Sequence, residues 1–199
     1  MVEILTVCTG NICRSPLAEL LLRTRLADLH PTIASAGTRG LRSAPMTPEA
    51  VSLADQLGVP ADVASQHRSR FLTENLLTSP DLILAMTRNH RRAIAELAPA
   101  RMRSTFTVRE FARLSADLTD AEITEAATTA GTDAASRVRA AAALVASRRG
   151  LAVPPASPDD DDVVDPYGRS WQTYVTTANQ LVPALDEVER VVRAALAAG

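Results

Sequence analysis

The chain gathers several reactive side chains close to its start. Residues 7–16 read VCTGNICRSP, with a thiol at Cys8 and a guanidinium at Arg14. An apolar run at residues 3–7 reads as a strand, and apolar residues at helical spacing follow Pro16. A tight loop between a strand and a helix start gathers backbone N–H groups and the positive end of the helix dipole. The stretch therefore predicts an anion-binding loop with a nucleophilic thiolate at its centre.

The residue types inside this loop suit phosphate chemistry. The planar fork of Arg14 can bind two phosphate oxygens, and Gly10 lets the backbone approach closely. Asn11 tolerates the left-handed conformation that a tight loop needs. Ser15 could donate a hydrogen bond to the Cys8 sulfur and is expected to be the N-cap of the helix. The alternative is a buried structural cysteine beside a surface arginine, because C-x5-R spacing alone is common.

A thiolate that attacks phosphorus needs a proton donor for the leaving oxygen, and the best candidate lies far along the chain. The segment is Asp165-Pro166-Tyr167-Gly168. Pro166 biases Asp165 toward an extended conformation and stiffens the loop. Tyr167 could form a wall of the pocket and stack on an aromatic leaving group. Alone the segment would be an ordinary turn, but with the Cys8 loop it predicts a general acid.

Composition and charge narrow the class of protein. The chain has 199 residues, is 46% hydrophobic and carries a net charge of -2, which does not point to nucleic acid as a partner. No apolar run reaches membrane-spanning length and the start is not a signal peptide, so we expect a cytoplasmic protein without membrane insertion. All 21 basic residues are arginines. Two cysteines match neither a disulfide framework nor a common zinc spacing, so no metal site is expected.

Strand and helix patterns alternate along the first half of the chain. Strands are expected at 3–7, 32–36, 81–86 and 104–108, and helices at 16–29, 47–57 and 87–97. This order predicts an α/β three-layer sandwich, with a four-stranded parallel sheet and helices on both faces. Residues 109–151 are helical without a strand, 153–162 form a Pro-rich acidic loop, and 170–198 form one long helix. We therefore expect a single domain over 1–199 with a mainly helical insert at about 112–158.

These segments together resemble a known family. The run from Cys8 to Pro16, with Asp165-Pro166-Tyr167, is similar to the low molecular weight protein tyrosine phosphatases, and most of all to bacterial members associated with exopolysaccharide export. The resemblance covers residues 1–111 and 163–199. It implies hydrolysis of phosphotyrosine through a phosphocysteine, with Cys8 as nucleophile, Arg14 binding phosphate and Asp165 as general acid and base. It implies no cofactor. Further implied roles are phosphate binding by Thr9, Gly10, Asn11, Ile12, Cys13 and Ser15, support from Ser35, His67 and Pro166, and a pocket rim at Leu41 and Tyr167.

The resemblance leaves alternatives for the substrate. Ile12 stands where the related arginine phosphatases carry Thr, which favours phosphotyrosine over phosphoarginine. The implied partner is a phosphotyrosine protein such as a bacterial tyrosine kinase. A phosphoprotein-binding module with little turnover is the alternative from another functional class. The physiological substrate and the oligomeric state are not fixed by the sequence.

Other features also allow two interpretations. His67 is equally well explained as a structural histidine. Cys13 could trap an oxidised Cys8 as a disulfide or be a small buried loop residue. The insert could cover the pocket, bind a partner, hold the acid loop or be a solvated decoration. Residues 159–162 are interpreted as a solvated acidic run.

Overall fold

One parallel sheet forms the centre of the molecule. The computed structural model describes residues 1–39 and 42–197. The strands are β1 (Glu3–Cys8), β2 (Thr32–Gly37), β3 (Leu82–Ala85) and β4 (Thr105–Thr107), in the order β2-β1-β3-β4. β1 pairs in parallel with β2 on one side and with β3 on the other. The strand order therefore reverses at β1, and the crevice at its carboxyl end is where α/β proteins of this kind bind ligands.

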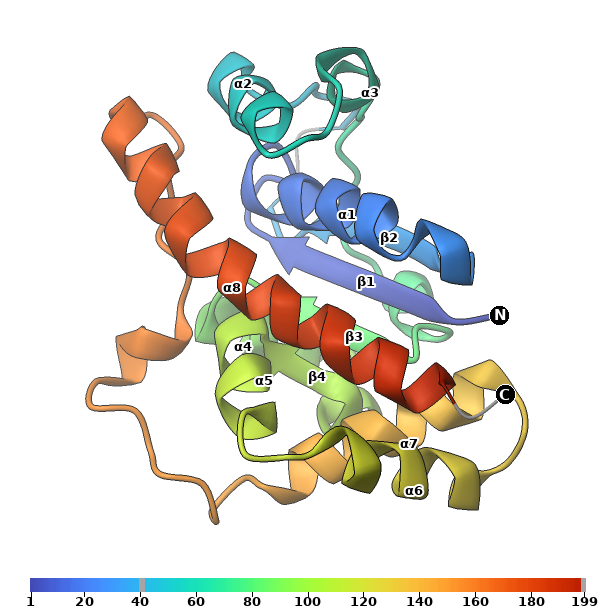
Figure 1. The fold of residues 1–199 in the computed structure, drawn as a ribbon. Coiled ribbons are helices and arrows are strands. Elements are labelled where there is room, and N and C mark those ends of the chain that lie inside the picture. The colour runs from blue at the N-terminus through green and yellow to red at the C-terminus, as the bar shows by residue number, and fades with distance from the viewer. Residues whose placement is uncertain (40–41, 198–199) are drawn as a thin grey trace.

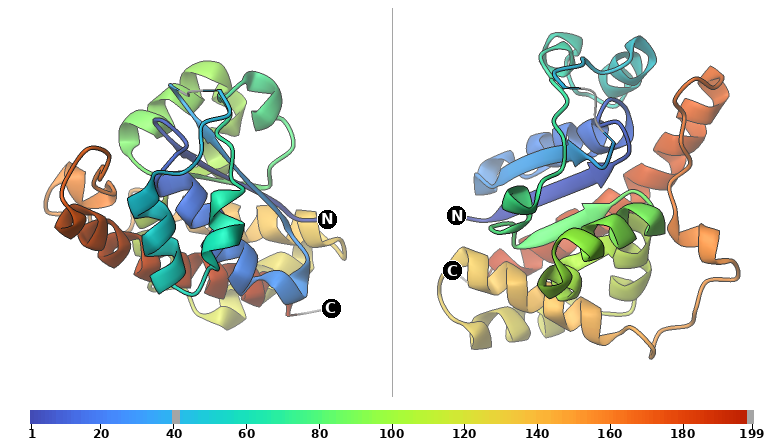
Figure 2. Two further views of the ribbon diagram at one scale, coloured as in Figure 1. Left: turned by 90° about the horizontal axis from the view of Figure 1, so that it is seen from above. Right: turned by 180° about the vertical axis from the view of Figure 1, so that it is seen from behind.

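Helices cover both faces of the sheet. Along β1, Ile4 and Cys8 belong to the larger hydrophobic core, whereas Leu5 and Val7 belong to the smaller one. On the larger core lie α1 (Arg14–Arg25) and α8 (Trp171–Leu196). On the other face lie α4 (Arg88–Leu97) and the short η2 (Glu74–Leu77), which the view from behind in Figure 2 shows in front of the sheet. The predicted three-layer α/β fold is confirmed.

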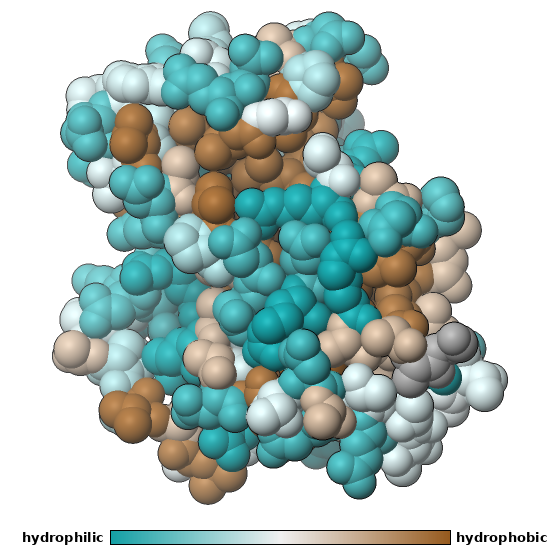
Figure 3. All heavy atoms as spheres, viewed as in Figure 1, coloured by the Kyte–Doolittle hydropathy of each residue, from teal (hydrophilic) through white to brown (hydrophobic). Residues whose placement is uncertain are grey.

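Two short helices extend the core beyond β2. They are α2 (Pro48–Gln56) and α3 (Ala61–Ser65), at the top of Figure 1. The space-filling view shows hydrophobic side chains between this pair and α1 (Figure 3). α2 starts where the sequence predicts, because the Thr47 hydroxyl accepts a hydrogen bond from Ala50 N at 3.2 Å.

The expected start of the first helix is wrong by two residues. α1 begins at Arg14 rather than Pro16, and its N-cap is Cys13, with no side-chain cap bond. Ser15 is therefore not the N-cap but a buried residue of the first turn. The physical reason is that the loop turns into the helix before Ser15, which directs the hydroxyl toward Cys8.

The chain after β4 is helical. α5 (Val108–Ser115), α6 (Asp120–Ala130) and α7 (Ala134–Ser147) gather around α8 near β4 (Figure 1). Short 3-10 turns complete the fold at η1 (Ala27–Leu29), η3 (Pro99–Ser104) and η4 (Pro158–Asp161). The Arg190 guanidinium joins α8 to α5 and to the start of α6 by donating to the carbonyls of Ser115 at 2.9 Å and Leu118 at 3.1 Å. That this region is an insert within a single domain stays a prediction. Within 1–39 and 42–197, no helix combines the length and apolarity needed to span a membrane.

Candidate active site

The loop between β1 and α1 is held with its carbonyl groups turned outward. Cys8 is the last residue of β1, and the chain enters α1 at Arg14. Four neighbours bind the loop carbonyls: Thr38 N to Cys8 O at 2.9 Å, Arg39 N to Thr9 O at 2.9 Å, His67 Nε2 to Asn11 O at 2.8 Å and Thr47 N to Ile12 O at 3.0 Å. Because these carbonyls point away from the cavity, the amide groups between them face it and form a cradle for an anion.

The Cys8 sulfur is the centre of this cradle. The backbone N–H of Asn11 lies 3.3 Å from the sulfur and the Ser15 hydroxyl oxygen 3.0 Å from it. Ser15 accepts a hydrogen bond from Asn11 Nδ2 at 3.0 Å, and its own hydrogen can be donated to the sulfur at 3.0 Å or to the Ala36 carbonyl at the longer distance of 3.4 Å. The buried sulfur thus lies within hydrogen-bond reach of a backbone N–H and a hydroxyl group.

The Asn11 side chain holds the loop in place through hydrogen bonds to its neighbours. Its φ of 55° lies in the left-handed region, which asparagine tolerates. Asn11 Nδ2 also donates to Ser35 Oγ at 2.7 Å, and Ser35 donates to the buried carboxylate of Glu19 at 2.5 Å. Asn11 Oδ1 accepts the backbone N–H of Arg70 at 2.9 Å. The amide is thus held at both ends, and Glu19 joins the site without having been predicted.

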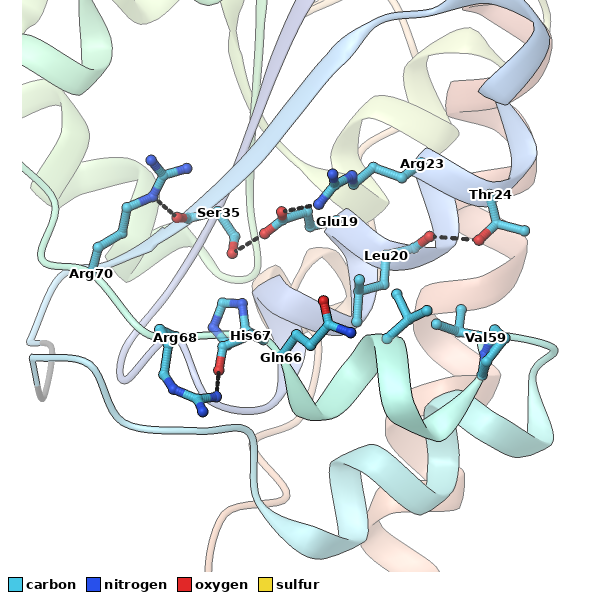
Figure 4. A pocket seen from close by; sticks show the side chains of 12 residues that line it. Glu19, Leu20, Arg23, Thr24, Ser35, Val59, Gln66, His67, Arg68 and Arg70 are labelled. Atoms are coloured by element: carbon cyan, nitrogen blue, oxygen red, sulfur yellow. Dashed lines mark hydrogen bonds and ion pairs between the residues drawn. The ribbon is translucent and has the colours of Figure 1, made fainter.

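A cavity of about 580 Å³ lies behind this network. Figure 4 shows Ser35 and Glu19 facing each other there, with Arg23 beside Glu19. His67 lines the same cavity, and burial lowers the pKa of its imidazole. The neutral ring donates through Nε2 to the Asn11 carbonyl. The structure therefore places Ser35 and His67 around Asn11, where they support the loop.

Gly37 is a second residue that sequence reasoning did not select. It ends β2 beside the loop, and a Cβ on this residue would lie 2.6 Å from the Thr9 carbonyl oxygen and 3.1 Å from Asn11 N. The 2.6 Å contact is shorter than a real Cβ allows, and the Thr9 oxygen is backbone that cannot turn away, while the 3.1 Å contact is tighter than most. Glycine is therefore required where β2 passes the loop.

Arg14 and Asp165 meet across the cavity from opposite ends of the chain. Arg14 is buried, donates to Val163 O at 3.1 Å and pairs with Asp165 Oδ2 at 2.7 Å. Among the residues that the structure describes, none bonds to the buried Nε atom of Arg14. A buried N–H without a partner is costly, and a bound phosphate oxygen would satisfy it. The Asp165 carboxylate is half-exposed and also accepts a hydrogen bond from the backbone N–H of Tyr167 at 3.2 Å.

The segment that presents Asp165 is fixed to the body of the protein. The backbone N–H of Val163 donates a hydrogen bond to the carbonyl of Met86, the residue after β3, at 2.8 Å. The backbone N–H of Val164 donates to Oε1 of Gln180 in α8, also at 2.8 Å. In Figure 1 this orange segment rises along the side to which the tip of β1 points. Pro166 begins the turn that Arg169 N closes at 3.0 Å.

The acidic run before Asp165 is not simply solvated. Asp161 is buried and binds the Arg113 guanidinium through both oxygens, at 3.0 and 2.7 Å. Asp162 accepts the backbone N–H of Arg88 at 2.7 Å, and Asp159 pairs with the Arg88 side chain. The interpretation as a solvated run holds for the exposed Asp159 and Asp160 but is wrong for Asp161 and Asp162, because α4 and α5 supply arginines that no local pattern shows.

The catalytic cavity itself is small, at about 190 Å³. Its lining consists of Cys8, Thr9, Gly10, Ile12, Cys13, Arg14, Arg39, Asp165 and Tyr167. Cys8 and Cys13 are both free thiols. Cys13 lies 3.8 Å from the Tyr174 hydroxyl, and burial raises the pKa of its thiol. The expected rim residue Leu41 lies outside the described residues.

His90 is a third residue that the sequence did not reveal. Its side chain is buried, with Nε2 at 2.8 Å from Thr9 Oγ1 and Nδ1 at 2.9 Å from Thr87 Oγ1. Burial, together with the charge of Arg14, lowers the pKa of His90 to about 3. The ring is therefore neutral and holds Thr9 from the start of α4. A histidine on a helix face carries no spacing signal that points to such a role.

Comparisons with known proteins agree with this geometry. The family described as low molecular weight phosphotyrosine protein phosphatase matches residues 3–141. The probable low molecular weight protein-tyrosine-phosphatase EpsP of Ralstonia solanacearum is 40% identical over 114 residues, which are 57% of this chain and 75% of that protein. The protein-arginine-phosphatase of Bacillus subtilis is 37% identical over 111 residues, 55% of this chain and 71% of that protein. The crystal structure of a low molecular weight protein tyrosine phosphatase from T. tengcongensis superposes with a TM-score of 0.64 at 27% identity, covering 94% of this chain and 97% of that one. These matches agree with the cradle around Cys8 and with the meeting of Arg14 and Asp165 at the same cavity. The chain therefore belongs to the low molecular weight phosphotyrosine protein phosphatase family.

Proposed function

We propose that the protein hydrolyses phosphotyrosine in other proteins through a covalent phosphocysteine at Cys8. One observation carries the proposal: the Cys8 sulfur receives two donors inside an anion cradle, while Arg14 and Asp165 meet at the same cavity. Nucleophile, phosphate-binding cation and proton donor are then within one site.

In the first step the Cys8 thiolate attacks phosphorus. A sulfur–phosphorus bond forms and the bond from phosphorus to the phenol oxygen breaks. Asp165 gives its proton to that oxygen, so the product leaves as a neutral phenol. The loop amides and the free Nε–H of Arg14 bind the phosphate oxygens, on which negative charge gathers in the transition state.

In the second step water attacks the phosphocysteine. Asp165, now a carboxylate, takes a proton from the water, and the sulfur–phosphorus bond breaks to release inorganic phosphate. The Ser15 hydroxyl, 3.0 Å from the sulfur, stabilises the thiolate as it leaves. The enzyme returns to its starting state.

The walls of the cavity support an aromatic substrate. Ile12 and Tyr167 offer apolar surface to a phenol ring, and the half-exposed Asp165 lies beside them. The relative EpsP is named a probable low molecular weight protein-tyrosine-phosphatase, which favours a phosphotyrosine protein as the partner, for example a bacterial tyrosine kinase. The proposal includes a cytoplasmic location, where a free thiol such as Cys8 stays reduced.

Phosphoarginine is the alternative substrate, because an arginine phosphatase is also among the relatives. Wild type and Cys8→Ser should be compared on phosphotyrosine and phosphoarginine peptides of matched sequence. We expect phosphate release from phosphotyrosine that Cys8→Ser abolishes. Release mainly from phosphoarginine would change the substrate, and phosphopeptide binding without turnover would identify a binding module. Full activity in Cys8→Ser would exclude the phosphocysteine.

A leaving-group series tests the role of Asp165. Asp165→Ala is expected to slow phenyl phosphate, whose phenol needs a proton, by about a hundredfold. The same substitution should slow a nitrophenyl phosphate much less, because its oxygen leaves well without a proton. Equal losses on both substrates would show that Asp165 acts only through its pair with Arg14.

A further inference from the structure

A second cavity adjoins the catalytic one. It has a volume of about 620 Å³ and shares Thr9, Arg14, Arg39 and Asp165 with the catalytic cavity. Its remaining walls come from Thr38, after β2, and from α4 and the residue before it, which supply Thr87, Asn89, His90, Arg92, Ala93 and Glu96. A peptide whose phosphotyrosine fills the smaller cavity must place neighbouring side chains over the larger one.

The charge of this second cavity is mainly positive. Arg39 is exposed, and no ion pair among the described residues includes it. Its backbone N–H is fixed to the Thr9 carbonyl at 2.9 Å, so its side chain starts at the border of the two cavities. Arg92 pairs with Glu96 on the helix surface, where both side chains are highly exposed and the pair contributes little. An arriving anion can therefore recruit both guanidinium groups at small cost.

His90 lines this second cavity and its imidazole ring is uncharged. Its ring bonds Thr9 and Thr87 and carries no charge near pH 7. The acidic groups of the lining are Glu96, whose pair with Arg92 is highly exposed, and Asp165, which pairs with the buried Arg14. The uncompensated charge at the border is thus that of Arg39, in a protein whose net charge is negative.

We propose that this second cavity binds an anionic side chain of the substrate, so that the enzyme selects phosphotyrosines with an acidic neighbour. The inference rests on the proposed phosphatase function and names the substrate class for that site. Arg39 binds the anion at the border of the cavities, and Arg92 binds it from α4. A carboxylate of Asp or Glu and the phosphate of a second phosphotyrosine share this chemistry.

Four phosphotyrosine peptides that differ only at the residues flanking the phosphotyrosine test the idea. The flanking residues are Glu, Gln, Lys or a second phosphotyrosine. We expect kcat/KM for the Glu peptide to exceed that for the Gln peptide about tenfold at low salt, with the Lys peptide lowest and the preference falling as salt rises. The ratio between the doubly phosphorylated peptide and the Glu peptide identifies which anion the cavity prefers.

The substitutions Arg39→Gln and Arg92→Gln, singly and together, are expected to reduce the Glu-to-Gln ratio toward one. Arg103→Gln is the matched control, because Arg103 is an exposed arginine of η3, next to the amino end of β4. Equal turnover of the Glu, Gln and Lys peptides would overturn the acidic subsite and leave the phosphatase intact. Failure to turn over any peptide would overturn the proposed function instead.

Discussion

His90 fixes the orientation of the Thr9 hydroxyl. The Thr87 oxygen accepts the backbone N–H of His90, so its hydrogen is free to donate to Nδ1 of the ring. Nε2 then carries the ring proton and donates to Thr9, which also accepts Arg14 Nη2 at 3.4 Å. The hydrogen of the Thr9 hydroxyl is consequently left for a phosphate oxygen.

The depressed pKa of His90 predicts a pH-dependent stability. The unfolded chain binds a proton near the ordinary value of 6.5, whereas the folded chain binds it only near 3. The neutral His90 ring therefore contributes its whole stabilisation above pH 6.5, and this stabilisation is lost as the pH falls from 6.5 toward 3. Between pH 7 and pH 5 the loss is about 2 kcal/mol.

Urea unfolding of wild type and His90→Gln at the two pH values measures this loss. The wild type should lose about 2 kcal/mol more than His90→Gln does between pH 7 and pH 5. His30→Asn is the control, since His30 is exposed and Asn tolerates its φ of 49°. Identical pH slopes in wild type and His90→Gln would contradict the neutral buried ring.

Some residues of the site can be identified from the sequence alone, whereas others cannot. Cys8, Arg14 and Asp165 can be selected from their types and local surroundings. His90 and Glu19 cannot, because their partners Thr9 and Ser35 are distant in sequence, and each becomes a site residue only when the sheet forms. The Ser15 hydroxyl was predicted to reach the sulfur, which it does, yet its cap role is wrong, since α1 begins at Arg14 and Ser15 lies inside its first turn.

At the scale of elements, the acidic segment anchors the chain just before Asp165, the proposed catalytic acid. Asp161→Asn removes the charge from a partly buried bidentate pair and is expected to lower the free energy of unfolding by about 2 kcal/mol. It should also slow phenyl phosphate more than nitrophenyl phosphate, because Asp165 is less firmly positioned. Denaturant unfolding and the leaving-group series measure the two effects.

Asp159→Asn provides the matched control for this anchor. The Asp159 side chain is 83% exposed, so its pair with Arg88 should contribute less than about 0.5 kcal/mol. Equal effects of the two substitutions would show that the segment acts only through its net charge.

The strands and most helices follow from local patterns. All four strands lie within the predicted runs or extend them by a single residue. This agreement is expected because strands of a buried parallel sheet consist of short, continuous apolar runs. The role of the acidic run does not follow, since it depends on Arg88 and Arg113 from other elements. Local periodicity contains no information on such pairings.

At the scale of the whole molecule, some residues stabilise the fold at the β4 edge of the sheet and do not line the cavity around Cys8. Arg149, just after α7, donates to Glu110 at 2.8 Å and to Thr105 O at 2.7 Å, and lies 4.2 Å from the ring centre of Phe106. Arg149→Met leaves Glu110 with weaker partners and should lower the free energy of unfolding by about 2 kcal/mol. The kinetic constants for an aryl phosphate should not change, because Arg149 contacts no residue of the catalytic cavity.

Thermal unfolding and steady-state kinetics of Arg149→Met test this separation. Arg103→Met serves as the control, since Arg103 is exposed and its loss should change stability by less than about 0.5 kcal/mol. A fall in kcat with unchanged stability would contradict the assignment of Arg149 to the scaffold.

The distance along the chain between nucleophile and acid has a consequence for synthesis. Arg14 closes its contact with Val163 across 149 residues, and the long helix α8 follows that contact. A ribosome that adds about 5 to 20 residues per second finishes the cradle early and delivers the proton donor many seconds later. A growing chain therefore holds a phosphate-binding loop without a working catalyst. Under the proposed mechanism, turnover therefore requires that α8 has docked against the segment that carries Asp165.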